Sequence, residues 1–441
     1  MSIKVGMISL GCPKNQIDAE IMLACLRDEG CVLTDGVDEA DVVVINTCGF
    51  IEDAKKESIE NILEMAQLKK EGRIKGIVVT GCLAQRYYKE MAGEFPEVNC
   101  ILSVGSADKI AQAVRAANGG KTLLAESAPE QLAISGKRVL TTLPFYSYIK
   151  IAEGCDNRCT YCIIPDLRGR YRSRPMEEIV EEAKELAAGG VKELVVVAQD
   201  TTRYGQDLYG ELRLPQLLHA LGEIDGLRWI RLLYCYPDRV TDELIDTIAR
   251  EDKIVKYLDL PIQHVSPKIV KAMNRRDDRA QLEALIKKLR ARIPGLTLRT
   301  TLIVGFPGET EEDFAELEQF VKETRFERLG VFAYSKEDGT PAAELPEQID
   351  EDLKKRRQEI IMECQTRIAE ENNARLIGQE IEVLCEGFDR YAECNFGRSS
   401  ADAPEIDGKV FFTAEKRPEP GSFVRIKVTD ICDYDLTGEL I

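Results

Sequence analysis

The chain has 441 residues, with 77 Asp and Glu against 59 Lys and Arg, which gives a formal net charge of −18. This length exceeds the roughly 100–200 residues of one domain. With 44% hydrophobic residues the chain can build several cores, which excludes an intrinsically disordered protein. The acidity argues against a general affinity for nucleic acid, because phosphate contacts require clustered Lys and Arg. The charge therefore indicates either solubility or attraction to a basic partner.

The 14 cysteines are the second unusual feature of the composition. The first residues lead directly into a strand-like segment, and no signal peptide or membrane-length apolar run is evident. We therefore expect no membrane contact and a reducing, cytoplasmic location, where cysteine motifs indicate metal or redox chemistry. The only two histidines, His219 and His264, lie far apart in the sequence. Chemistry built on a histidine pair is therefore not expected.

Residues 1–118 alternate buried strand patterns with helical stretches. Strands are predicted at 3–9, 41–46 and 76–81, and helices at 16–29, 52–70 and from about 82 to 92. Continuous β-branched runs separated by helices are typical of a doubly wound parallel α/β domain. Residues 119–140 are predicted to be a linker. Their "GGKT" is not a phosphate-binding loop, since that motif needs a glycine where this chain has Arg115.

Residues 141–372 repeat strand–helix units. The predicted strands are 146–152, 194–198, 230–234, 257–260, 298–304 and 329–334, and the predicted helices include 175–188, 280–293 and about 351–373. Six units are fewer than the eight of a complete β/α barrel, so we expect a partial, six-unit TIM-like barrel. Residues 373–441 show short alternating runs divided by Gly and Pro. They predict a small antiparallel, OB-like β-barrel.

Three cysteines directly follow the first predicted barrel strand. Cys155, Cys159 and Cys162 have C-x3-C-x2-C spacing, and barrel enzymes place their chemistry at this end of the strands. Three thiolates can hold three irons of a [4Fe–4S] cluster and leave the fourth iron open. Zinc is the competing interpretation, but a structural zinc site usually needs a fourth protein ligand, and none lies nearby in the sequence.

The N-terminal region carries a second triad, because each of its three predicted strands ends near a cysteine. These are Cys12, Cys48 and Cys82. Ligands of open α/β sheets bind at the carboxyl ends of the strands, so the three thiols could converge. The alternative is that they are simply buried, as cysteines often are. The other eight cysteines show no such pattern and are interpreted as structural.

The motif around Cys155 resembles that of the radical S-adenosylmethionine (SAM) enzymes, with Tyr161 as the aromatic residue before the last cysteine. The resemblance implies that the open iron binds SAM and that reductive cleavage yields a 5′-deoxyadenosyl radical. Residues at other strand ends resemble the cofactor contacts of that superfamily: Gln199, Asp200, Gln263, His264, Gly305 and Gly308.

The two triads together resemble the methylthiotransferases, radical SAM enzymes that insert sulfur and a methyl group at an unactivated carbon. This resemblance implies that Cys12, Cys48 and Cys82 of the present chain ligate an auxiliary [4Fe–4S] cluster. It also implies that the C-terminal barrel is a TRAM domain for substrate recognition. Two [4Fe–4S] clusters, SAM and an external electron donor of ferredoxin or flavodoxin type are therefore expected. A non-catalytic iron–sulfur carrier or scaffold is the alternative from another class.

One branch of this family modifies tRNA adenosines, and another modifies an aspartate of the twelfth protein of the small ribosomal subunit. "SLGCPKN" and "CTYCIIPDLRGRYRSRP" resemble the second branch. Residues 375–441 hold eight Lys and Arg against 14 Asp and Glu, a net charge of −6, which suits a basic ribosomal protein and not tRNA. The aromatic residues of this segment are expected in its own core: Phe388, Tyr391, Phe396, Phe411, Phe412, Phe423 and Tyr434.

Four arginines alternate just after the cysteine loop: Arg168, Arg170, Arg172 and Arg174. A solvated loop is one interpretation of this cluster. The other is that one of the guanidinium groups receives the carboxylate of the substrate aspartate, because arginine binds carboxylates through two parallel hydrogen bonds.

Overall fold

The computed structural model describes residues 2–441. Its N-terminal domain is a six-stranded parallel sheet in the order β2-β1-β3-β4-β5-β6. The strands are β1 (Lys4–Ser9), β2 (Val32–Leu33), β3 (Val42–Thr47), β4 (Gly76–Gly81), β5 (Cys100–Leu102) and β6 (Leu123–Ala125). The predicted doubly wound domain is confirmed. The sheet extends into the predicted linker, since β6 pairs with β5 through short apolar residues that the sequence pattern did not distinguish from loop.

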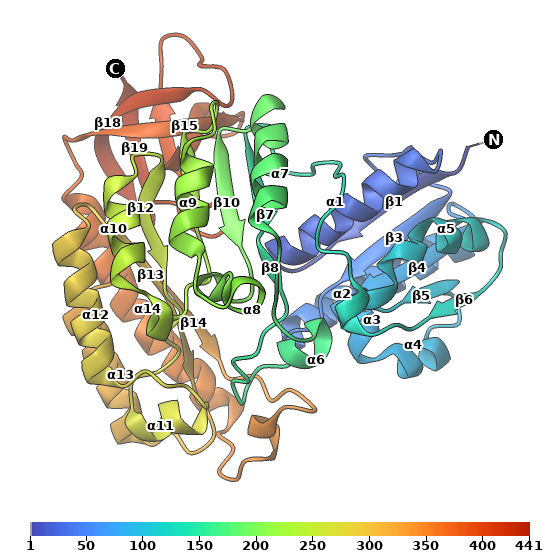
Figure 1. The fold of residues 1–441 in the computed structure, drawn as a ribbon, viewed down its shortest axis with the longest axis horizontal. Coiled ribbons are helices and arrows are strands. Elements are labelled where there is room, and N and C mark those ends of the chain that lie inside the picture. Colours follow the sequence, from blue (N-terminus) through green and yellow to red (C-terminus); the bar gives the residue numbers. More distant parts are fainter. Residues whose placement is uncertain (1) are drawn as a thin grey trace.

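Helices cover both faces of this sheet (Figure 1). They are α1 (Pro13–Asp28), α2 (Glu52–Lys70), α3 (Cys82–Arg86), α4 (Tyr88–Glu94) and α5 (Ile110–Asn118). Helices α1 and α5 pack on one face, where Met22 and Val114 share a core, and α2 to α4 pack on the other, with Ile62 and Met91. Because both faces are buried, β3 and β4 carry no exposed residue.

The central domain is an open six-stranded parallel sheet in the sequential order β7-β10-β11-β12-β13-β14. The strands are β7 (Tyr146–Lys150), β10 (Glu193–Val197), β11 (Trp229–Leu232), β12 (Ile254–Asp259), β13 (Thr297–Val304) and β14 (Arg328–Ala333). The main helices are α7 (Met176–Ala188), α9 (Leu214–Gly222), α10 (Asp242–Arg250), α12 (Arg279–Arg292), α13 (Glu311–Thr324) and α14 (Glu351–Ala374). The predicted six-unit partial barrel is therefore confirmed.

Several short elements complete the central domain. They are α6 (Ile164–Arg168), α8 (Gln206–Tyr209), α11 (Pro267–Ala272) and the two-stranded pair β8 (Ala152–Glu153) and β9 (Arg172–Ser173). Helix α6 lies between the central domain and the N-terminal domain (Figure 1). None of the helices in residues 2–441 is long and apolar enough to cross a membrane.

The C-terminal domain is a closed five-stranded barrel in the order β15-β16-β17-β19-β18. Its strands are β15 (Glu380–Asp389), β16 (Cys394–Ser399), β17 (Val410–Thr413), β18 (Phe423–Cys432) and β19 (Asp435–Leu440). All pairs in the barrel are antiparallel except β17 with β19, which is parallel. Of the seven aromatic residues predicted in its core, Phe412 lies there. The prediction was wrong for Phe423, which packs against Trp229 of the central sheet, and for Tyr391, which is fully exposed at the β15–β16 turn.

Buried ion pairs fasten this barrel to the central sheet. Arg398 pairs with Glu193 of β10 at 2.6 Å, and Glu193 also pairs with Arg231 of β11 at 2.7 Å. All three side chains are at most 3% exposed. Removing Glu193 would leave the buried Arg231 without its carboxylate partner, and such a loss typically costs about 3–5 kcal/mol. The C-terminal domain is therefore held in a defined position on the sheet.

Candidate active site

The first cysteine triad lies on the loop that follows β8. Gly154, at the start of this loop, has a φ of +81°, and a Cβ there would stand 2.1 Å from the carbonyl oxygen of Arg170. The backbone N–H of Cys155 donates to the carbonyl of Gly169 at 3.1 Å, and that of Cys162 donates to the carbonyl of Cys159 at 3.0 Å. The glycine and these bonds fold the segment back on itself. As a result, all three thiols face the same cavity.

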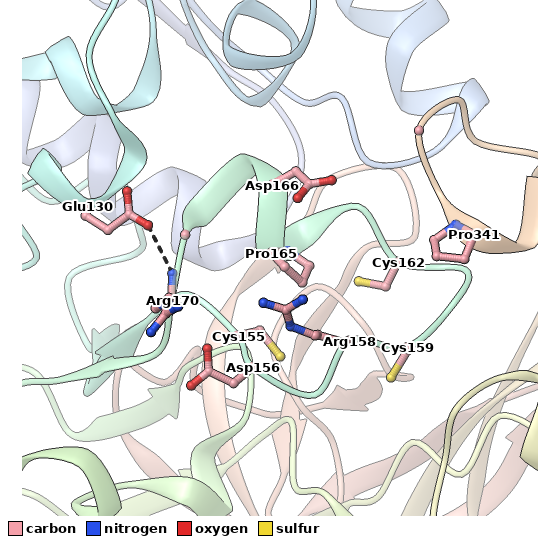
Figure 2. A pocket seen from close by; sticks show the side chains of 12 residues that line it. Glu130, Cys155, Asp156, Arg158, Cys159, Cys162, Pro165, Asp166, Arg170 and Pro341 are labelled. Carbon is pink, nitrogen blue, oxygen red and sulfur yellow. Dashed lines mark hydrogen bonds between the residues drawn. The ribbon is translucent and has the colours of Figure 1, made fainter.

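This cavity has a volume of about 300 Å³ (Figure 2). Besides Cys155, Cys159 and Cys162, it is lined by Glu130, Asp156, Arg158, Pro165, Asp166, Gly169, Arg170, Gly339 and Pro341. It therefore combines three soft sulfur donors with charged groups of both signs. The segment predicted as a linker contributes Glu130 at the edge of the cavity, where its carboxylate accepts from the N–H of Arg170 at 3.4 Å.

The thiols of this loop suit an iron–sulfur cluster. Burial raises the pKa of Cys155 to about 12 and also raises that of Cys162, so the thiolate forms need a positively charged partner. Within residues 2–441, no three His, Cys, Asp or Glu side chains are grouped around a point that could hold one metal ion. The ligands of a cluster bind different irons, so they need not meet at one point.

Gln199 and Asp200, which follow the second strand of the central sheet, make hydrogen bonds around the cysteine loop. Gln199 donates to Glu153 at 2.5 Å, while its own buried Oε1 has no hydrogen-bond partner among residues 2–441. Asp200 accepts from Asn157 at 2.9 Å and from Arg239 at 3.0 Å, so it anchors the cysteine loop. Of the two residues predicted after the second strand, Gln199 thus keeps an acceptor free for a ligand, and Asp200 has its carboxylate occupied by protein groups.

None of the predicted cofactor contacts, Gln199 and Asp200 included, belongs to the cavity lining. Tyr161 packs against the apolar cluster of Phe306 and Tyr334, and Gln263 has a φ of +70°. Gly305, with a φ of +72°, lies under α14, where a Cβ would meet the side chain of Lys354 at 2.3 Å. Gly308, with a φ of +79°, lies in the turn before α13. Backbone conformation and packing thus account for both glycines, and their contact with SAM stays a prediction.

His264 is buried and adopts a defined tautomer. Its Nδ1 accepts from the backbone N–H of Ser266 at 3.0 Å, so the proton of a neutral imidazole resides on Nε2. Nε2 lies 3.5 Å from Glu309 and has no hydrogen-bond partner in the described residues. The imidazole therefore stabilises the backbone turn at Ser266 through Nδ1, and its Nε2–H stays available as a donor.

The second triad forms at the carboxyl edge of the N-terminal sheet. Strands β1, β3 and β4 are neighbours, and Cys12, Cys48 and Cys82 come shortly after their ends. Gly11 has a φ of +89°, and a Cβ there would stand 2.7 Å from the Cβ of Cys48. Burial first, and then the neighbouring Cys82, raise the pKa of Cys48 to about 12. The fold therefore brings together three thiols that are remote in sequence.

Two asparagines hold these strand ends in place. Asn15 donates to the carbonyls of Leu10 at 2.7 Å and of Thr47 at 3.3 Å, and Asn46 donates to the carbonyl of Asn15 at 2.7 Å. Both side chains are buried. Because they join the segments that carry Cys12 and Cys48, the loop geometry does not depend on the cysteines alone.

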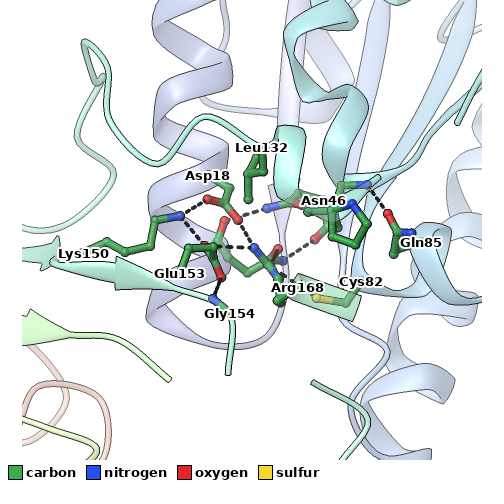
Figure 3. A network of polar contacts seen from close by, with 12 residues as sticks. Asp18, Asn46, Cys82, Gln85, Leu132, Lys150, Glu153, Gly154 and Arg168 are labelled. Atoms are coloured by element: carbon green, nitrogen blue, oxygen red, sulfur yellow. Dashed lines mark hydrogen bonds and ion pairs between the residues drawn. The ribbon is translucent and has the colours of Figure 1, made fainter. Parts of the chain in front are cut away.

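A buried polar network extends from Cys82 of the second triad to Glu153, which directly precedes the loop of the first triad (Figure 3). Lys150 of β7 pairs with Asp18 of α1 at 2.5 Å and with Glu153 at 2.7 Å. Arg168, at the end of α6, pairs with Asp18 at 2.5 Å and donates to the Sγ of Cys82 at 3.3 Å. Burial favours the neutral form of Glu153, but Lys150 and Arg168 hold its pKa at about 2. Glu153 is therefore ionised although it is buried.

The four predicted substrate-binding arginines have different environments. Arg168 and Arg174 are buried, and Arg174 donates to the carbonyl of Lys150 at 2.7 Å and pairs with Glu182. Arg172 donates to the carbonyl of Glu130 at 2.5 Å. Arg170 alone of the four lines the cavity. The solvated-loop interpretation is wrong for Arg168 and Arg174, because both are buried and pair with acids of helices α1 and α7, Asp18 and Glu182.

Sequence reasoning missed Glu130, Asp156, Arg158 and Asp166 at the cavity. Asp156 and Arg158 lie inside the cysteine motif, so their position on the loop was a usable signal. Glu130 lies in residues 119–140, which show no helix or strand periodicity, so nothing in the sequence indicated that it lines the cavity. The Asp18–Lys150 pair joins residues 132 positions apart and could not be inferred without the fold.

Comparisons with known proteins agree with this architecture. Residues 149–321 match the model of the Radical SAM superfamily, residues 377–441 match the TRAM domain, and residues 4–103 match Uncharacterized protein family UPF0004. The chain is 51% identical to ribosomal protein uS12 methylthiotransferase RimO of Thermoanaerobacter sp. and 53% identical to that of Caldanaerobacter subterraneus, over 99% of each chain. The chain belongs to the RimO family. The corresponding protein of Geobacter sulfurreducens is 49% identical over 99% of this chain and 98% of its own.

Solved structures resemble this RimO-family chain in fold. The radical S-adenosylmethionine methyltransferase TsrM from Kitasatospora setae, solved with cobalamin and a [4Fe-4S] cluster, aligns with a TM-score of 0.56 at 16% identity, covering 78% of this chain and 77% of its own. The cobalamin-dependent S-adenosylmethionine radical enzyme OxsB aligns with a TM-score of 0.52 at 12% identity, covering 82% and 56%. At these identities the similarity concerns the fold alone.

Proposed function

We propose that this protein is a radical SAM methylthiotransferase that adds a methylthio group to the β-carbon of an aspartate in ribosomal protein uS12. The observation that carries the proposal is the presence of two separate cysteine triads in one chain of the RimO family. One triad lines the cavity at the barrel, and the other lies at the edge of the N-terminal sheet. An iron–sulfur carrier would need neither the barrel cavity nor a cluster with an open iron.

In this proposal Cys155, Cys159 and Cys162 hold a [4Fe–4S] cluster, and Cys12, Cys48 and Cys82 hold a second one. When bound, the first cluster supplies the electron that cleaves SAM, and the second supplies sulfur for transfer. A ferredoxin or flavodoxin type donor would deliver that electron from outside. The soft thiolate donors of both triads suit iron–sulfur clusters.

The protein's own residues position the reactants and exclude water. Asp200, Asn157 and Arg239 hold the cysteine loop in place. The free Oε1 of Gln199 is a hydrogen-bond acceptor suited to the amino group of SAM. Arg170, on the cavity wall, is the one arginine of the predicted four that is placed to meet the carboxylate of a substrate aspartate.

The C-terminal barrel is suited to a basic substrate. Its net charge is −6, and its exposed acidic side chains include Glu393, Asp430, Asp433 and Glu439. Part of its acidity is used internally, since Asp402 pairs with Arg328 of the central sheet at 2.6 Å. The remaining exposed carboxylates would attract a basic ribosomal protein and repel RNA phosphates. The proposal includes a cytoplasmic location, where ribosomal proteins are made.

Competition between the two substrates of the family tests the proposal. The reconstituted enzyme is incubated without oxygen with SAM, a reductant, ribosomal protein uS12 and bulk tRNA, and both are analysed by mass spectrometry. We expect a methylthio group on one aspartate of uS12 and unmodified tRNA. Modified tRNA with unmodified uS12 would assign the protein to the other branch, and no 5′-deoxyadenosine at all would exclude radical SAM chemistry.

A further inference from the structure

Arg168 joins the two triads through a direct contact with a cysteine. It ends α6, six residues after Cys162 of the cavity, yet its guanidinium reaches the N-terminal domain. There it donates to the Sγ of Cys82 at 3.3 Å and to Asn15 at 3.0 Å. One side chain from the barrel therefore contacts a sulfur that belongs to the other site.

The charge of Arg168 acts at short range and away from solvent. The residue is 2% exposed, and the cysteine that it contacts is buried as well. Asp18 and Glu153 face it as anions, and Lys150 is the second cation of the network. Because the surroundings are buried, a change of one charge in this network acts on the Cys82 sulfur with little screening.

We propose that Arg168 is a positioning residue that raises the reduction potential of the cluster held by Cys12, Cys48 and Cys82. This inference rests on the proposed function, because it requires a second cluster. Reduction adds one negative charge to a cluster, and hydrogen bonds to its sulfur ligands are among the factors that set its potential. A guanidinium that donates to a ligand sulfur stabilises the reduced form through a charge-assisted bond. The same contact keeps α6, and with it the cavity loop, against the N-terminal sheet.

The neighbouring carboxylate predicts a shift of opposite sign. Asp18 lies 2.5 Å from both Arg168 and Lys150, and it partly neutralises them. Replacing it with the isosteric Asn removes one negative charge near Cys82, while Asn15 and Glu153 still contact the Arg168 guanidinium. A purely structural role for the network would give no reason for Arg168 and Asp18 substitutions to move a potential in opposite directions.

The test is an anaerobic redox titration of the full-length, reconstituted protein followed by electron paramagnetic resonance. Addition of SAM identifies the cluster that binds SAM, because only its signal changes, and the other signal is the one measured. We expect a lower midpoint potential in R168M, a smaller decrease in R168K, which keeps the charge but not the planar donor group, and a higher midpoint potential in D18N. R174M is the matched control, since Arg174 is also buried in the same arginine cluster and pairs with Glu182.

Iron content and thermal unfolding are measured for each variant, so that loss of the fold is separated from a change in potential. Unchanged midpoint potentials in R168K and D18N with full iron content would overturn the inference, as would equal shifts in R168M and R174M. A wild-type protein that binds only one cluster would instead refute the two-cluster proposal. The two failures are therefore distinguishable.

Discussion

The two cysteine triads present similar ligands by different means. Cys155, Cys159 and Cys162 lie within eight residues on one loop, whose turn at Gly154 directs them into a cavity. Cys12, Cys48 and Cys82 are spread over 71 residues and are brought together only because β1, β3 and β4 are adjacent and parallel. The first site is a local structure placed on a barrel, whereas the second is a product of the whole N-terminal sheet.

The two sites also differ in their surroundings. The loop borders a cavity of about 300 Å³, while Cys82 at the sheet edge is buried and contacts Arg168. The loop site is therefore open to a small molecule, whereas the sheet site lies beside a buried polar network. Because the two triads lie on different structural elements, we expect a substitution of one cysteine to remove the cluster of its own triad only.

The largest expected effect follows from Cys155→Ala. Without Cys155 only two of the three cysteine ligands remain on the cavity loop, which is too few to hold the cluster. We therefore expect complete loss of 5′-deoxyadenosine formation from SAM. The measurement is chromatographic quantification of 5′-deoxyadenosine after anaerobic incubation with SAM and a reductant. Wild-type amounts of 5′-deoxyadenosine from this variant would show that the loop does not hold the cluster that cleaves SAM.

Cys12→Ala should affect the other triad and spare the cavity loop. Because Cys12 lies on the N-terminal sheet, we expect SAM cleavage within about tenfold of the wild-type rate, a change of at most ~1.4 kcal/mol in the barrier. Transfer of the methylthio group should be lost. Mass spectrometry of uS12 together with 5′-deoxyadenosine quantification measures both activities, and equal loss of both would contradict separate tasks for the two triads.

A matched pair of glycine substitutions sharpens the comparison further. Gly154→Ala would place a Cβ 2.1 Å from the Arg170 carbonyl, and Gly11→Ala would place one 2.7 Å from the Cys48 Cβ, both at positive φ. The backbone conformation alone costs about 1–3 kcal/mol for a residue other than glycine. We expect G154A to lose iron from the cavity site and G11A to lose iron from the sheet site. Iron analysis combined with the SAM-dependent resonance signal distinguishes the two, and identical losses would show general unfolding.

The smallest expected effect is the pH dependence of the network between the sites. Burial opposes ionisation of Glu153, but Lys150 and Arg168 lower its pKa to about 2, below the ordinary value of 4.5. Its contribution to the free energy of unfolding is therefore fully present above about pH 4.5 and is lost as the pH falls towards 2. The stability difference between wild type and E153Q should be constant from pH 7 to 5 and should narrow below that. A difference that already narrows above pH 5 would contradict an ion pair at this position.

Features that depend on neighbouring residues could be predicted from the sequence, whereas features that depend on the tertiary fold mostly could not. The cavity triad, the six barrel units and helix α2 could be predicted, because spacing and periodicity are local signals. The sheet triad could be inferred only through the rule that parallel strands end at one edge. Strand β6 and the role of Glu130 were missed, since short segments without periodicity look like a linker. The partners of Arg168 were beyond reach because they depend on how two domains meet.

Iron stoichiometry tests the central claim, that two triads hold two independent clusters, most directly. Iron and sulfide are measured in anaerobically reconstituted wild type, Cys155→Ala and Cys12→Ala, with Mössbauer spectroscopy to identify the cluster type. We expect about eight irons per chain in wild type and about four in each variant, all in [4Fe–4S] form. About four irons in wild type, or loss of all iron in either folded variant, would contradict it.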